Sequence, residues 1–206
     1  MLLPALCIAL ALLAATVFVL HRVYVRLGAW RFGLLALGLG LLPPVGVAQL
    51  RHRFHMQLVP DALEARGPLY VMEDSWGFGP GGNEAGILVF ALPPRVASAI
   101  ERGGTGYLSA LPPNADQQRR DWRGDFHDWQ PTPVQPDAGW PRNPRSGRLE
   151  LTDYICAYGF CIDIDPAVAA DATRAVNAPG SYHARGRIGR IVVDPRARRV
   201  YCFYNG

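Results

Sequence analysis

The hydrophobic pattern divides this chain into two regions. Two stretches near the start, Leu2–Leu20 and Phe32–Leu50, contain no charged side chain. A helix of about 20 residues is long enough to cross the hydrocarbon core of a bilayer. The pattern therefore predicts a membrane anchor over residues 1–53, built from two transmembrane helices at about 2–20 and 32–50.

Each stretch leaves one alternative open. The second contains four glycines together with Pro43 and Pro44, which predict a kink and would also suit a re-entrant or interfacial segment. The first could be a cleaved signal peptide, but no basic residue precedes Leu2 and no good cleavage site of small residues precedes His21. Two spans remain the preferred interpretation.

Arginines at the edges of the two stretches predict the orientation. Arg22, Arg26 and Arg31 lie in the short connection, whereas Arg51 and Arg53 follow the second stretch. Basic residues near the ends of a span favour the cytoplasmic side. The denser connection is therefore expected in the cytoplasm, which places the rest of the chain in the periplasm of a bacterial inner membrane.

The pattern after residue 53 predicts a single soluble domain over residues 54–206. Short apolar runs alternate with turn signals, two helices begin at Pro-containing starts, and a turn over 194–198 joins the last two strands. We expect an α+β fold, with an antiparallel sheet, about two helices on one side and a C-terminal β-hairpin. The strands expected are Leu69–Met72, Ile87–Leu92, Leu149–Cys156, Phe160–Ile164, Arg187–Val193 and Arg199–Tyr204.

The distribution of charge along the chain indicates which class of binding partner to expect. The formal charge of the chain is +4, which could suggest a nucleic-acid partner. However, all 17 acidic residues follow position 53 and five of the 21 basic residues lie at or before it, which leaves the domain near −1. Binding to a phosphate backbone needs a surplus of cationic side chains, so the expected partners are the lipid bilayer and a protein of the envelope, without nucleic acid.

A long loop at about 114–148 is rich in proline and tryptophan. Long irregular loops in compact domains are often functional, and Trp and Arg are frequent in binding hot spots. The tryptophans could instead only cover a thin core. The candidates for partner binding are Arg119, Arg120, Trp122, Arg123, Trp129 and Trp140.

The most reactive-looking residues lie in the same loop. His127 has Asp125 and Asp128 as near neighbours, and Glu73 is a further acid in another loop. A histidine oriented by a carboxylate can act as a general base, so a membrane-anchored hydrolase that uses His127 with Asp125 or Glu73 is the alternative function. No nucleophile motif accompanies these residues.

The cysteines predict a crosslink rather than a metal site. Cys156 and Cys161 are separated by four residues and could form a disulfide across a tight connection, or remain two buried thiols. Cys202 is left over or pairs with one of them. No second ligand pair accompanies them, so neither a metal nor a cofactor is expected.

The glycine-rich segment Gly77–Gly82 fits a dinucleotide-binding pattern but precedes a strand instead of a helix, so we expect no nucleotide there. The preferred function is therefore binding. The periplasmic domain would dock another envelope protein, either as an immunity-type protein or as an accessory subunit of a membrane complex.

Overall fold

The computed structural model of the chain describes residues 18–19, 21–26, 28–76, 84–112, 114, 124–187 and 189–205. The chain divides into two compact units, Met1–Arg51 and His52–Gly206.

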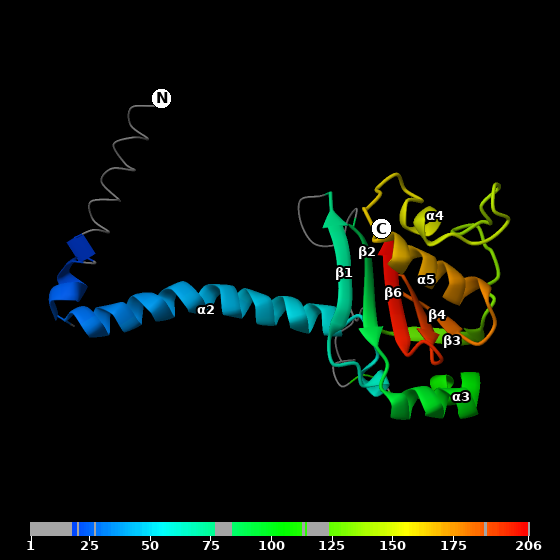
Figure 1. The fold of residues 1–206 in the computed structure, drawn as a ribbon, viewed down its shortest axis with the longest axis horizontal. Helices are drawn as coiled ribbons and strands as arrows, with labels where there is room; N and C mark the ends of the chain where they lie inside the picture. The colour runs from blue at the N-terminus through cyan, green and yellow to red at the C-terminus, as the bar shows by residue number, and fades with distance from the viewer. Residues whose placement is uncertain are drawn as a thin grey trace. The chain divides into compact units, whose positions relative to one another are not determined.

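Helix α2 (Ala29–Met56) is the main element described in the first unit and continues for a few residues into the second (Figure 1). It contains the whole of the apolar stretch 32–50, with Pro43 and Pro44 inside the helix. Except for Phe18 and Val19, the stretch 2–20 lies outside the described residues. No helix among the described residues is both long enough and apolar enough to cross a membrane.

The second unit is built on a six-stranded antiparallel sheet, which confirms the α+β class. The strand order is β1-β2-β6-β5-β4-β3, so that β1 and β3 form the two edges. The bounds are β1 Pro68–Ser75, β2 Glu84–Ala91, β3 Phe126–Pro131, β4 Tyr182–Gly186, β5 Arg190–Asp194 and β6 Arg199–Asn205. The expected hairpin is β5–β6, which closes through the turn at 195–198.

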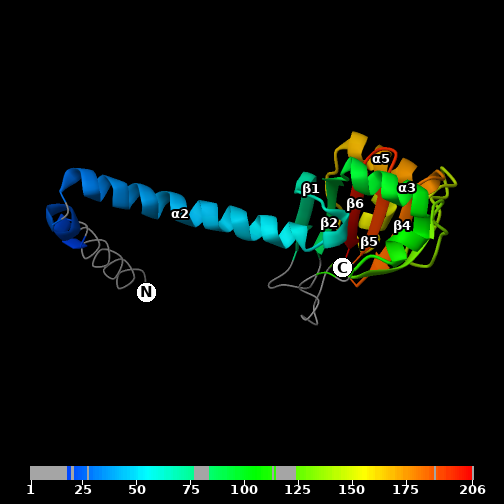
Figure 2. The same ribbon diagram turned by 90° about the horizontal axis from the view of Figure 1, so that it is seen from below.

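Helices cover both faces of the sheet, so the expectation of two helices on one side is wrong. One apolar cluster packs α3 (Pro94–Ser109) against the face that carries Leu88 and Cys202. The other packs α4 (Leu151–Ile155) and α5 (Pro166–Asn177) against the face that carries Phe203 (Figures 1 and 2). The physical reason is that both faces of the central strands are apolar, and a sheet of that kind must be covered twice.

The two strands expected at 149–156 and 160–164 are also wrong. Leu151, Tyr154 and Ile155 are buried at helical spacing on one side of the short helix α4. The preceding backbone is bonded to α5: the Leu149 N–H donates to Asn177 Oδ1 at 3.1 Å and the Leu151 N–H to Thr173 Oγ1 at 3.1 Å. The side chains of Asn177 and Thr173 therefore accept the backbone hydrogen bonds that a neighbouring strand would have accepted.

The start signal of α5 is confirmed. Asp165 caps the helix by accepting a hydrogen bond from the Ala167 N–H at 2.8 Å, and Pro166 is its first residue. In contrast, edge strand β3 was not expected, because it lies inside the Pro/Trp-rich loop. It ends at Pro131, a residue that an edge strand tolerates because one side of the strand makes no ladder. The 3₁₀ turn η1 (Asp61–Leu63) precedes β1.

Candidate functional site

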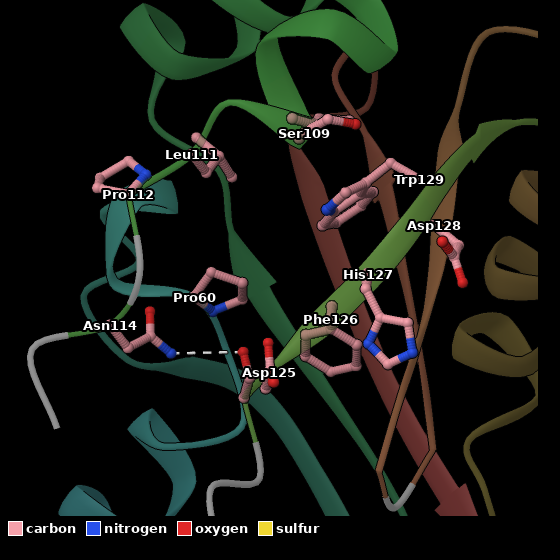
Figure 3. Close-up of a pocket in the computed structure, with 12 residues that line it drawn as sticks. Pro60, Ser109, Leu111, Pro112, Asn114, Asp125, Phe126, His127, Asp128 and Trp129 are labelled. Carbon is pink, nitrogen blue, oxygen red and sulfur yellow. Dashed lines mark hydrogen bonds between the residues drawn. The ribbon is translucent and has the colours of Figure 1, made fainter. Parts of the chain in front are cut away.

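A hollow of about 270 Å³ lies beside edge strand β3 and contains the reactive-looking residues of the sequence (Figure 3). It is formed where the end of α3 and the segment after it approach β3. Its lining combines apolar and polar side chains: Pro60, Leu108, Ser109, Leu111, Pro112, Asn114, Gly124, Asp125, Phe126, His127, Asp128 and Trp129.

An irregularity in β3 determines which of these side chains are exposed. The register between β3 and β4 shifts between His127 and Gln130, and Asp128 adopts a left-handed conformation with φ of 57°. The bulge lets both Phe126 and Trp129 pack toward the core on the α3 side, although three positions separate them. As a result, His127 and Asp128 are exposed.

His127 has no catalytic partner among the described residues. Neither the His127 side chain nor the Asp125 side chain makes a hydrogen bond or ion pair there, and both residues are exposed. The interactions at the hollow are structural: buried Asn114 accepts from the Asp61 N–H at 2.8 Å and donates to the Gly124 carbonyl at 3.4 Å (Figure 3). Asn114 thus holds the segment that precedes β3, a role that the sequence did not indicate.

Glu73 lies in a different cluster. Its Oε1 accepts a hydrogen bond from His55 Nε2 at 3.0 Å, and its Oε2 accepts one from the Tyr204 hydroxyl at 3.0 Å. His55 is buried at the end of α2, whereas Glu73 is on β1 and Tyr204 on β6. The structure therefore gives Glu73 a histidine partner, but this partner is His55. The pairing of β1, β2 and β6 brings Glu73 and Tyr204 together, and the end of α2 adds His55, so no sequence spacing could reveal this cluster.

The tryptophans at the partner-binding positions are core residues where the structure describes them. Trp129 is 9% exposed and Trp140 is 1% exposed. Trp140 donates its indole N–H to the Glu150 carbonyl at 2.8 Å and packs on Tyr154 and Phe203. The other four candidates, Arg119, Arg120, Trp122 and Arg123, lie outside the described residues.

Cys156 and Cys161 form a disulfide, with their Cα atoms 4.6 Å apart. Cys156 directly follows α4, so the bridge closes the turn after that helix and not a β-hairpin. Cys202 is a free, buried thiol in the core, and it donates to the Leu58 carbonyl with an Sγ–O distance of 3.1 Å. Burial strongly raises the pKa of Cys202, so that this thiol is protonated and unreactive at neutral pH.

A charged cluster lies on the α5 side of the sheet. Asp137 accepts from the guanidinium groups of Arg185 and Arg190, at 2.5 Å in the case of Arg190. Desolvation would raise the pKa of Asp137, but the hydrogen bond and charge of Arg190, with the charge of Arg185, outweigh it and lower that pKa. Across the described ranges, no group of three or more His, Cys, Asp or Glu side chains is arranged to hold a metal ion.

The fold and these clusters define an α+β domain with helices on both faces of an antiparallel sheet. No protein-family model, curated protein or solved structure matches the chain.

Proposed function

We propose that this chain is a membrane-anchored binding protein of the bacterial inner membrane. Its sheet domain would face the periplasm and dock another envelope protein, as an immunity-type protein or an accessory subunit. The observation that carries the binding role is the exposed edge at β3, where Asp125, His127 and Asp128 project without a partner among the described residues. Exposed edge strands are common sites for protein association.

Two further observations support the proposed location. Exposed apolar side chains are spread along α2, including Leu34, Leu37, Leu42 and Leu50, and a bilayer would be a favourable solvent for them. The disulfide between Cys156 and Cys161 suits a compartment outside the reducing cytoplasm. Under this proposal, residues 1–53 form the anchor, and the spans at about 2–20 and 32–50 stay predictions from the two uncharged stretches of the sequence.

The hydrolase alternative receives less support. A general base needs an orienting group and a proton to abstract within hydrogen-bonding reach. In the described part of the chain the His127 side chain has no orienting group, and Glu73 is already bonded to His55 and Tyr204. The same exposed groups are well suited to hydrogen bonding with the surface of a protein partner.

Site-specific photo-crosslinking in cells tests the docking edge. A photoreactive residue at position 127 is expected to give one discrete adduct of higher mass. The matched control places the same residue at Ala170, which is exposed on α5, away from the hollow beside β3. An adduct at position 127 alone supports the proposal, whereas equal adducts at both positions, or none at either, would refute docking at β3.

A further inference from the structure

His183 is a buried histidine whose hydrogen-bonding capacity is unused. It is the second residue of β4 and is only 6% exposed. Among the described residues, neither Nδ1 nor Nε2 has a hydrogen-bond partner. Buried polar atoms are nearly always paired, and an unpaired one costs about 1–3 kcal/mol. The imidazole therefore keeps two unused hydrogen-bonding atoms inside the domain.

Arg190 on the neighbouring strand β5 also has a buried nitrogen without a hydrogen-bond partner among the described residues. It is 7% exposed, and its Nη2 bonds to Asp137 while its Nη1 has no partner among the described residues. The rings of Trp140 and Tyr154 hold the guanidinium, each with its centroid 5.5 Å from Cζ. This packing keeps a cation inside the domain with one donor group unused.

The strand register brings these side chains to one face. His183 is paired with Val192, and Arg185 with Arg190, so that positions 183 and 185 on β4 and 190 on β5 share the α5 side. Arg185 belongs to the same group, because its guanidinium bonds to Asp137 but remains largely exposed. Arg185 and Arg190 thus both bond to Asp137, on the same side of the sheet as the His183 ring.

A hollow of about 380 Å³ opens beside this group, and both His183 and Arg185 line it. The remaining lining residues are Asp128, Trp129, Gln130 and Gln135. The two glutamines add amide donors to the imidazole and guanidinium. This set of donors is suited to an oxyanion. The charges of the two arginines are balanced by Asp137 and by Asp128 in the lining, so the hollow has no surplus charge for a multiply charged group, and its unused donors suit a singly charged one.

We propose that this hollow is a binding site for a carboxylate group, which accepts hydrogen bonds from the His183 ring and the Arg185 guanidinium. The inference goes beyond the docking edge proposed above and does not depend on a membrane location. Arg190, which is not among the lining residues, would contribute through its charge and its hydrogen bond to Asp137. The carboxylate could belong to a small acid or to a chain terminus of a partner.

The ionisation of His183 supports this site and gives it a pH dependence. Burial, and then the charges of Arg190 and Arg185, lower the pKa of His183 to about 4, while Asp137 opposes this shift. The free site therefore holds a neutral imidazole at neutral pH. A bound carboxylate adds a negative charge that favours the protonated ring, so binding should tighten as the pH is lowered from neutral toward the pKa of the free ring.

The test uses the full chain in detergent micelles with 15N-labelled histidine. Ring resonances are followed by NMR while sodium acetate replaces sodium chloride at constant ionic strength. We expect a saturable shift of the His183 signal, assigned by its loss in His183→Asn. In Arg185→Gln, acetate should bind at least about tenfold more weakly, which corresponds to the loss of one charge-assisted hydrogen bond.

The matched control is Arg102→Gln, which removes an exposed arginine from α3 and should leave acetate binding unchanged. A parallel titration with sodium phosphate distinguishes the ligand class. A saturable response to acetate that depends on Arg185 supports the site. A stronger response to phosphate than to acetate, an equal response in both arginine variants, or no saturable shift of His183 would overturn the proposal.

Discussion

Tyr204 on β6 reaches across strand β2 to hydrogen bond with Glu73 on β1, two strands away, at 3.0 Å. The register places Gly86 between them, paired with Glu73 on one side and with Tyr204 on the other. A Cβ atom at Gly86 would lie 2.6 Å from the Tyr204 ring. The absence of a side chain at position 86 therefore makes the bond between Tyr204 and Glu73 possible.

Gly86→Ala should accordingly destabilise the domain. The added methyl group must displace the Tyr204 ring, which weakens its bond to Glu73, and we expect a loss of about 1–3 kcal/mol in the free energy of unfolding. Urea denaturation of the detergent-solubilised chain measures it. Gly106→Ala is the control, because nothing lies within 4 Å of its added Cβ. Equal stability of Gly86→Ala and the wild type would show that the tyrosine does not need this space.

The disulfide between Cys156 and Cys161 should stabilise the fold only modestly, because it closes a short loop. The loop-entropy relation gives about 2 kcal/mol for this size. A reducing agent should lower the stability of the wild type by about that amount and leave Cys156→Ala/Cys161→Ala unchanged. If the reducing agent has the same effect on both proteins, the disulfide is not the source of the stabilisation.

The free energy of unfolding should fall as pH drops through the range in which His183 is protonated in the unfolded chain but neutral in the folded chain. The pKa of His183 is lowered from 6.5 to about 4 in the folded chain. Below pH 6.5, His183 is therefore protonated in the unfolded chain but stays neutral in the folded chain. The resulting loss in the free energy of unfolding approaches about 3 kcal/mol near pH 4.

Unfolding free energies measured along this pH range test the effect. His183→Asn should remove most of the slope between pH 6.5 and 4. His127→Asn is the matched control, since the side chain of that exposed histidine makes no hydrogen bond or ion pair with the described residues, and this variant should retain the slope. A slope that persists in His183→Asn would assign the pH dependence to other groups.

Trp140 should contribute to stability instead of forming a docking surface. Trp140→Phe removes the indole N–H, leaves the Glu150 carbonyl without its partner and reduces packing on Phe203. We expect a loss of about 2–4 kcal/mol, measured by thermal or urea denaturation. Retained stability together with loss of the crosslink at position 127 would instead favour a direct role in binding.

The sequence predicted elements whose signals are local. The N-cap at Asp165, the apolar run of β2 and the turn between β5 and β6 each depend on a few adjacent residues. In contrast, the conformation of residues 149–156 depends on hydrogen bonds to Asn177 and Thr173, which belong to a helix more than twenty residues further along the chain. A local pattern of apolar residues could not distinguish a short helix docked on α5 from a strand.

The candidate sites show the same limit. The sequence identified Cys156 with Cys161 because their separation alone suggested a bridge. It did not identify His183 and Arg190, since in isolation they are unremarkable residues of two strands. Their significance comes from burial on one face and from nitrogen atoms without partners, and both properties arise only when β4 and β5 pair.

Protease accessibility of a C-terminal epitope in intact spheroplasts tests the central claim most directly, namely a domain anchored in the inner membrane and exposed to the periplasm. The account predicts that the full-length chain sediments with alkali-washed membranes. It also predicts that external protease removes the epitope while a cytoplasmic marker stays intact. Recovery of the chain in the supernatant, or an epitope that resists protease until the spheroplasts are lysed, would contradict the account.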